Sequence, residues 1–401
     1  MSHGFFRRLF GRRAPSSVLS IELLCEGVDV PPEVLRFEHA AGGRVLFGEG
    51  VLDQLGEEAS SLGKRALLVT DPGIRKAGHI DRAERVLQKA GLVVAPFDDV
   101  RENPTTLDVE RAVEAARHHD ADLIVGLGGG SSMDTAKGCN FILTNGGHMR
   151  DYWGVGKATS PMLPFIAIPT TAGTGSECQS FALIADEETH MKMACGDGKA
   201  AAKVAILDPE LTLTQPARVT ACTGIDAIAH AVETAVCTKR SSISSAYSRM
   251  AFRLLEQGFE RVLKAPDDLR ARAQMQLGAA FAGTAIEASM LGAAHSLANP
   301  LTAKYGTIHG QAVGVMLPHV VRANRKLPEV SAIYDELHSG LESRLEELLK
   351  ASQLGSPLKE LGVEVDCLDE LAGKAKEQWT AQFNPVSFSI PEFRELYEAA
   401  L

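Results

Sequence analysis

The spacing of hydrophobic positions changes about half-way along the 401-residue chain. Before residue 213, short runs of valine, isoleucine and leucine alternate with longer amphipathic stretches, a pattern typical of parallel strands joined by helices. The clearest predicted strands span residues 66–70, 122–126, 164–168 and 203–207. We therefore predict an α/β first half built on a parallel sheet.

From Gln215 and Pro216 onward the hydrophobic spacing is helical. Amphipathic runs lie near residues 247–263, 329–350 and 392–400, among alanine-rich segments. The second half is therefore predicted to be all-helical. We divide the chain into an N-terminal extension, an α/β domain and a helical domain, which span residues 1–34, 35–213 and 214–401.

A glycine cluster follows the second predicted strand and precedes a predicted helix. Glycines let backbone amides curl around an anion, and a helix N-terminus favours negative charge, so this turn is predicted to hold a pyrophosphate. It is neither the six-position dinucleotide fingerprint, because Ser131 stands where the last glycine would be, nor a Walker loop. The alternative is a tight strand-to-helix turn without a ligand. The residues of the turn are Gly128, Gly129, Gly130 and Ser131.

Polar residues also follow two other predicted strands. Asp71 ends an apolar run, where a parallel sheet presents a carboxylate to a ribose diol, so we predict that it selects NAD over NADP. The alternative is a turn-forming aspartate before Pro72. Thr170, Thr171 and Ser176 lie in a loop of hydroxyls and glycines, and they are predicted to hydrogen-bond the nucleotide.

Two pairs of possible metal ligands lie in the second half. Asp226 and His230 are four residues apart in a helical run, so they share one helix face. Pro300 and Gly306 separate the members of the second pair and are predicted to interrupt the helix, so that the chain folds back. That second pair is His295 and His309.

Three neutral imidazoles and one carboxylate suit Fe(II) or Zn(II), and the single negative charge leaves such an ion electrophilic. Mg(II) and Ca(II) prefer oxygen ligands and fit poorly. Any one of these histidines, taken alone, is more often an ordinary core or surface residue with its hydrogen bonds satisfied. The metal site is therefore predicted from the four residues together and not from any one of them.

Together these motifs resemble the iron-containing alcohol dehydrogenase family, which is similar in fold to glycerol dehydrogenase and dehydroquinate synthase. The match spans nearly everything after residue 35. It rests on the motifs at residues 128–137, 169–177, 224–230 and 309–319. The resemblance implies a Rossmann-like nucleotide-binding domain followed by a helical metal-binding domain.

The resemblance further implies hydride transfer between NAD(H) and a small alcohol or aldehyde. The metal ligands it implies are the four residues above, with His319 outside the site, and it leads us to expect a homodimer or a higher homo-oligomer. The implied cofactor-binding residues are Asp71, Asn103, Gly128, Gly129, Gly130, Ser131, Asp134, Thr170, Thr171, Thr174, Ser176 and Lys192.

One position departs from the family pattern. Many members carry a histidine credited with a proton relay four residues after the first of the two later ligands, and here that position is Asn299. An amide does not titrate in the working pH range, so the proton must leave by another route. The alternative functions are a hydroxyacid–oxoacid transhydrogenase, another metal-dependent enzyme on this scaffold, or a binding protein that has lost catalysis.

Composition narrows the class of protein. The formal net charge of −10, without a long basic stripe, argues against a general nucleic-acid binder. No stretch is apolar enough to span a bilayer. The seven cysteines form no C-x-x-C pair, which is typical of a reducing cytoplasm, and we assign none of them to the metal.

The first residues alternate aromatic and basic side chains, as in Phe5, Phe6, Arg7 and Arg8. Three interpretations are open for this extension: a disordered or surface-docked arm, a docking peptide for a larger assembly or bacterial microcompartment, and an organellar presequence. It has no long apolar core, so it is not a secretory signal.

Overall fold

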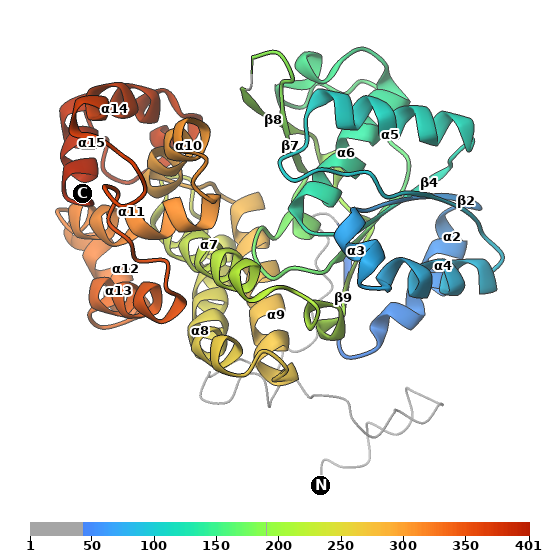
Figure 1. Cartoon of the computed structure of the whole chain (residues 1–401), viewed down its shortest axis with the longest axis horizontal. Coiled ribbons are helices and arrows are strands. Elements are labelled where there is room, and N and C mark those ends of the chain that lie inside the picture. Colours follow the sequence, from blue (N-terminus) through green and yellow to red (C-terminus); the bar gives the residue numbers. More distant parts are fainter. Residues whose placement is uncertain (1–42, 190) are drawn as a thin grey trace, which may run out of the picture.

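The computed structural model describes residues 43–189 and 191–401 (Figure 1). The first half contains a six-stranded sheet of order β1-β9-β6-β4-β2-β3, in which every neighbouring pair is parallel. The predicted parallel α/β sheet is therefore confirmed. Its strands are β1 (Arg44–Phe47), β2 (Arg65–Val69), β3 (Val93–Phe97), β4 (Leu123–Gly128), β6 (Phe165–Pro169) and β9 (Val204–Leu207).

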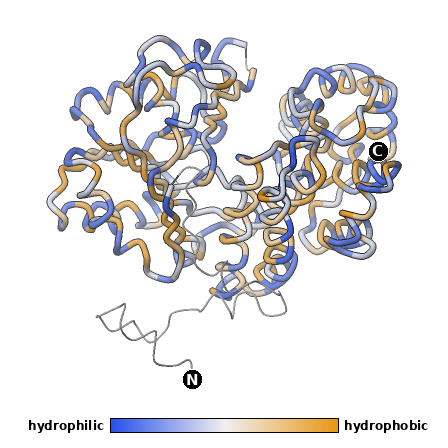
Figure 2. The backbone as a smooth tube through the Cα atoms, turned by 180° about the vertical axis from the view of Figure 1, so that it is seen from behind, coloured by the Kyte–Doolittle hydropathy of each residue, from blue (hydrophilic) through white to orange (hydrophobic). Residues whose placement is uncertain are grey.

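Helices cover both faces of this sheet, as its continuous apolar strands require. One face packs with α2 (Leu55–Leu62) and α4 (His79–Lys89), and the other packs with α5 (Thr106–His118) and α6 (Gly130–Asn145). The short helix α3 (Pro72–Lys76) follows β2. Figure 2 shows that hydrophilic residues gather on the outer turns of the helices while the strands are largely apolar.

A second sheet of three strands was not predicted. It has the order β5-β8-β7, with β5 (Gly154–Val155) parallel to β8 (Lys192–Gly196) and β7 (Phe181–Ala185) antiparallel to β8. Ala182 and Ile184 point into the core beneath α6, whereas the alternate residues of β7 are less buried. One face of this small sheet therefore stays outside that core.

Helices make up the regular structure that is described beyond residue 212, so the all-helical prediction is confirmed. They enclose one hydrophobic core. The helices are α7 (Ala217–Val236), α8 (Ser242–Lys264), α9 (Leu269–Glu287), α10 (Ala293–Tyr305), α11 (His309–Asn324), α12 (Pro328–Leu337), α13 (Leu341–Ser352), α14 (Leu368–Glu377) and α15 (Ile390–Glu398).

Two details of the helix prediction were wrong. The amphipathic run 329–350 is two helices, α12 and α13, because Gly340 adopts a φ of 77° and turns the chain. Pro300 does not interrupt α10 but lies inside it, since the apolar packing of Leu297 and Leu301 outweighs one missing backbone hydrogen bond. Gly306 ends that helix, as predicted, with a φ of 66°.

Several predictions fall outside what the structure describes or tests. The N-terminal extension, residues 1–34, and its docking role lie outside the described residues. The boundary at residues 213 and 214, the homo-oligomeric state and the cytoplasmic location stay predictions. Across residues 43–189 and 191–401, no helix is both long and apolar enough to cross a membrane.

Candidate active site

Three helices bring the four predicted metal ligands together. Asp226 and His230 lie one turn apart on α7, His295 lies in the first turn of α10, and His309 is the first residue of α11. The Nε2 atoms of His295, His230 and His309 lie 3.4, 3.5 and 3.8 Å from Oδ1 of Asp226. Donor atoms bound tetrahedrally to one transition-metal ion are separated by about 3.4 Å. The ligand atoms of Asp226, His230 and His295 all lie within 4.8 Å of one another, so these three fit a single ion, and His309 lies at the edge of the group.

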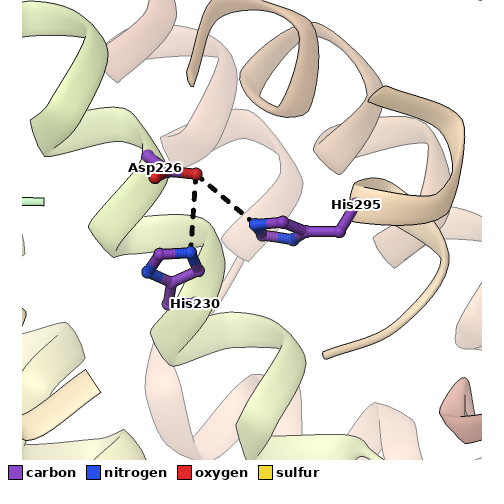
Figure 3. A group of neighbouring side chains, drawn as sticks. All are labelled: Asp226, His230 and His295. Carbon is purple, nitrogen blue, oxygen red and sulfur yellow. Dashed lines mark ion pairs between the residues drawn. The ribbon is translucent and has the colours of Figure 1, made fainter. Parts of the chain in front are cut away.

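Two of the proposed donor atoms lack a hydrogen-bond partner among the described residues. Asp226, His230 and His295 are buried and point toward one another (Figure 3). Within the described part of the chain, neither Oδ1 of Asp226 nor Nε2 of His295 has a hydrogen-bond partner. A buried polar atom without a partner costs about 1–3 kcal/mol, and a bound cation would remove that cost. The residues present therefore fit a divalent ion.

The charge states of Asp226 and His309 suit a cation. Burial alone would raise the pKa of Asp226, but the neighbouring imidazoles hold it below its usual range, so the carboxylate is ionised. Burial is the main cause that lowers the pKa of His309 to about 3. A neutral imidazole beside an ionised carboxylate is the form that coordinates a metal. Burial lowers the pKa of His295, but Glu233 and Asp226 raise it to about 9, so a cation that binds there must displace a proton.

Glu233 orients one of these imidazoles, a role that the sequence analysis missed. Its Oε2 meets Nδ1 of His295, and its Oε1 accepts a hydrogen bond of 2.7 Å from the backbone NH of Ala294. Fixing Nδ1 turns Nε2 of His295 toward Asp226. The spacing of Asp226, His230 and Glu233 places all three on one face of α7, and that pattern could have identified the residue.

Gly310 explains how His309 reaches the cluster. A Cβ at Gly310 would lie 2.0 Å from the carbonyl oxygen of Cys222, one turn before Asp226 on α7. The start of α11 can therefore approach α7 only with glycine at this position. The side chain of His309 is 31% exposed, the most of the four, so the cluster opens on its side.

We expect Gly310→Ala to destabilise the protein by about 1–3 kcal/mol and to weaken metal binding, because α11 must move away from a backbone carbonyl. Thermal unfolding and metal content would measure both effects. Gly373→Ala is the matched control, because a Cβ there meets nothing within 4 Å. Equal stability of the two variants would show that the close approach is unimportant.

Most of the predicted nucleotide-binding residues lie at or after the carboxyl ends of three adjacent strands, β2, β4 and β6, whereas Asn103 follows β3 and Lys192 is on β8. Gly129 is the N-cap of α6, and Gly128 has a φ of 150°. A Cβ on Gly129 would lie 3.3 Å from Thr171, and one on Gly130 would lie 2.8 Å from Thr174. The predicted strand, glycine turn and helix start are all present. The close approach of Thr171 and Thr174 leaves little room for a side chain at Gly129 or Gly130.

Asp71 and Asn103 border this turn. Oδ1 of Asp71 caps α3 by accepting from the NH groups of Gly73 and Ile74, and Oδ2 accepts a bond of 3.3 Å from Ser132. The turn-forming role is therefore present, and the ribose contact of Asp71 stays a prediction. Asn103, with a φ of 54°, donates its backbone NH to Oγ of Ser131 at 3.3 Å.

Three predicted cofactor residues are instead buried: Asp134, Thr170 and Ser176. Oγ of Ser176 donates to Asp134 at 2.9 Å. Nζ of Lys137, which the sequence analysis did not assign, donates to Oγ and the carbonyl of Ser176 at 2.9 and 2.6 Å and to the carbonyl of Phe181 at 2.9 Å. Asp134 and Ser176 therefore fix the loop after β6 onto α6 from the inside.

The loop after β6 also packs directly on the metal-binding half. A Cβ at Gly173 would lie 2.4 Å from Cβ of Thr223 on α7. A Cβ at Gly175 would lie 2.6 Å from Gly283 on α9. Lys192 on β8 is close enough for its charge to lower the pKa of His309 further. The loop after β6 therefore lies between the glycine turn and helix α7, which carries two of the predicted ligands.

Asn299, which replaces the histidine expected from the family pattern, lies one turn after His295 on α10. Its Nδ2 donates to Oε1 of Gln378 at 2.9 Å. A hydrogen-bonded pair of amides thus occupies the position of a proton relay.

Comparison with known proteins decides the family. The sequence-family model of iron-containing alcohol dehydrogenase matches residues 42–209. The family model of the C-terminal part of Fe-containing alcohol dehydrogenases matches residues 220–401. The chain belongs to the iron-containing alcohol dehydrogenase family. It is accordingly an oxidoreductase, and the resemblance expected from its motifs is confirmed.

Relatives of this iron-containing alcohol dehydrogenase cover almost its whole length. Alcohol dehydrogenase 4 of Schizosaccharomyces pombe is 34% identical over 89% of this chain and 87% of its own. NAD-dependent methanol dehydrogenase of Bacillus methanolicus is 32% identical over 89% and 97%. The crystal structure of a 1,3-propanediol oxidoreductase superposes with a TM-score of 0.86 at 31% identity, covering 91% of this chain and all of that one.

Proposed function

We propose that this iron-containing alcohol dehydrogenase transfers a hydride between NAD(H) and a small alcohol, diol or aldehyde. Fe(II), or alternatively Zn(II), is held by Asp226, His230, His295 and His309. The observation that carries the proposal is the convergence of three imidazole nitrogens on one carboxylate oxygen. The names of the relatives, an NAD-dependent methanol dehydrogenase and a 1,3-propanediol oxidoreductase, support NAD and a primary alcohol.

The bound ion supplies Lewis acidity toward the substrate oxygen, and the nicotinamide supplies the hydride chemistry. The residues of the chain hold the metal ligands and the nucleotide-binding loop in place. Glu233 holds His295 in the orientation for binding, and the contact between Gly173 and Thr223 sets the nucleotide loop against α7. Asn299 bonds Gln378 and does not accept a proton, so proton release takes another route in this enzyme.

Metal replacement tests the proposal. Anaerobic protein stripped with a chelator should oxidise NADH with short aldehydes at below about 1% of its initial rate, because no cation remains at the cluster. Refilling with Fe(II) or Zn(II) should restore the rate and show which ion is preferred.

Full activity in stripped protein would contradict a metal-dependent dehydrogenase. Binding of metal and NADH without turnover of any aldehyde would favour the transhydrogenase alternative, which a paired hydroxyacid and oxoacid assay would then reveal.

A further inference from the structure

The outer face of the small sheet is apolar. Phe181 and Leu183 lie on the face of β7 opposite the buried Ala182, and Leu183 is 38% exposed. In the antiparallel register these two residues pair with Gly196 and Ala194 of β8, which therefore share the same face. One pair further along, Ala185 pairs with Lys192, so the charge on this face is confined to one end.

A tryptophan from the helical half meets this face. The rings of Phe181 and Trp379 have centroids 6.0 Å apart, and Trp379 is 38% exposed. A Cβ at Gly196 would lie 2.4 Å from the ring of Phe181, so the glycine lets that ring lie across β8 toward Trp379. Figure 1 shows β7 and β8 on the side of the first half that faces α10.

Trp379 is fixed beside the helix that carries His295. Gln378 bonds Asn299, and Oγ1 of Thr380 lies 2.8 Å from Oγ of Ser296, so the residues on either side of Trp379 are tied to α10. Asn299 and Ser296 both lie within one helical turn of His295. The aromatic contact is therefore held against the helix that carries His295.

The same face is also attached to helix α6. The carbonyl of Phe181 accepts a hydrogen bond of 2.9 Å from Nζ of Lys137 on that helix. The apolar face thus extends from the helix that carries His295 to the helix that starts at the glycine turn. A substrate whose oxygen binds at the cluster would place its carbon chain against this face.

We propose, building on the proposed function, that Phe181, Leu183 and Trp379 form an apolar wall that binds the carbon chain of the substrate. The preferred substrates are then unbranched aliphatic alcohols and aldehydes longer than about three carbons, because each methylene buried on the wall adds roughly fourfold to kcat/KM. Diols are disfavoured, because a second hydroxyl placed on the apolar side chains of the wall loses its hydrogen bonds to water.

A chain-length series tests the wall. With NADH and metal-loaded enzyme, kcat/KM should rise by roughly fourfold per methylene from ethanal to hexanal. Trp379→Ala should flatten this rise, so that the ratio of kcat/KM for hexanal to that for ethanal falls toward one. Trp153→Ala is the matched control, since Trp153 is 45% exposed and takes no part in the wall, and it should keep the wild-type slope.

A binding measurement needs neither metal nor turnover. The chain has two tryptophans, so Trp153→Phe leaves Trp379 as the single indole fluorophore. Hexan-1-ol should change its emission saturably, and 1,3-propanediol at the same concentrations should not. The Trp379→Phe variant, which retains only Trp153, should not respond to hexan-1-ol.

The two experiments distinguish a failure of the wall proposal from a failure of the proposed function. The wall proposal would be overturned if kcat/KM did not depend on chain length. It would also be overturned if Trp379→Ala lost activity equally on all aldehydes. Saturable hexan-1-ol binding at Trp379 without turnover of any aldehyde would support the wall and overturn the proposed function.

Discussion

Replacing Asp226 by alanine is expected to lower kcat/KM by roughly a thousandfold, equivalent to about 4 kcal/mol of transition-state stabilisation. Oδ1 of Asp226 is the atom on which the three imidazoles converge, and it carries the only negative charge among the four proposed ligands. Without it, the histidines form a cluster of neutral donors with lower affinity for a cation. Metal content and steady-state kinetics would be measured on the same sample.

Asp335→Ala is the control for the loss of an aspartate. Asp335 is largely exposed and pairs with Arg325 at 2.9 Å, so its removal should leave activity and metal content within about twofold of the wild type. An Asp226→Ala enzyme that retained its metal and its rate would show that Asp226 is not a ligand.

The substitution Lys137→Met should destabilise the first half by about 3–5 kcal/mol. Lys137 is almost completely buried and donates to three oxygens of the segment 176–181. Burial lowers the pKa of Lys137 and raises that of Asp134, and the opposite charge of each residue partly offsets this effect on the other. Removing the amine leaves the carbonyl groups of Ser176 and Phe181 without this donor and takes a positive charge from the surroundings of the buried Asp134.

The melting temperature should fall on the order of 10 °C, and the KM for NADH should rise because the loop after β6 loses its attachment to α6. Lys199→Met is the matched control. Lys199 is 43% exposed and pairs with Asp197 at 3.2 Å, which predicts a change below about 1 kcal/mol. Similar melting temperatures for the two variants would contradict a supporting role for Lys137.

Local sequence predicted the parts of this enzyme that depend on local periodicity. The buried run 122–126 identified β4, and the glycines after it identified the start of α6. The spacing of Asp226 and His230 identified a shared helix face. Each of these signals is contained within a few residues, so no knowledge of tertiary packing was needed.

Features that depend on tertiary contacts escaped the sequence analysis. Nothing in the sequence around Lys192 distinguished strand β8, because a strand of a three-stranded sheet depends on its partner β7. Asp134 and Ser176 lie in motif segments, but only the fold shows that they bond each other in the interior. The role of Gly310 likewise becomes clear only when Cys222 of α7 is opposite it.

The contact between the loop after β6 and the helical half also limits how this enzyme can be recombined. Gly175 and Gly283 face each other backbone to backbone, and Gly173 faces Thr223, so an added methyl group on any of these glycines would displace main chain or a helix. A chimera that takes its nucleotide-binding half from a relative must therefore have glycine at the positions of Gly173 and Gly175, because Thr223 and Gly283 of the helical half leave no room for a side chain there. Exchange of the halves between homologues is limited to relatives that keep this contact.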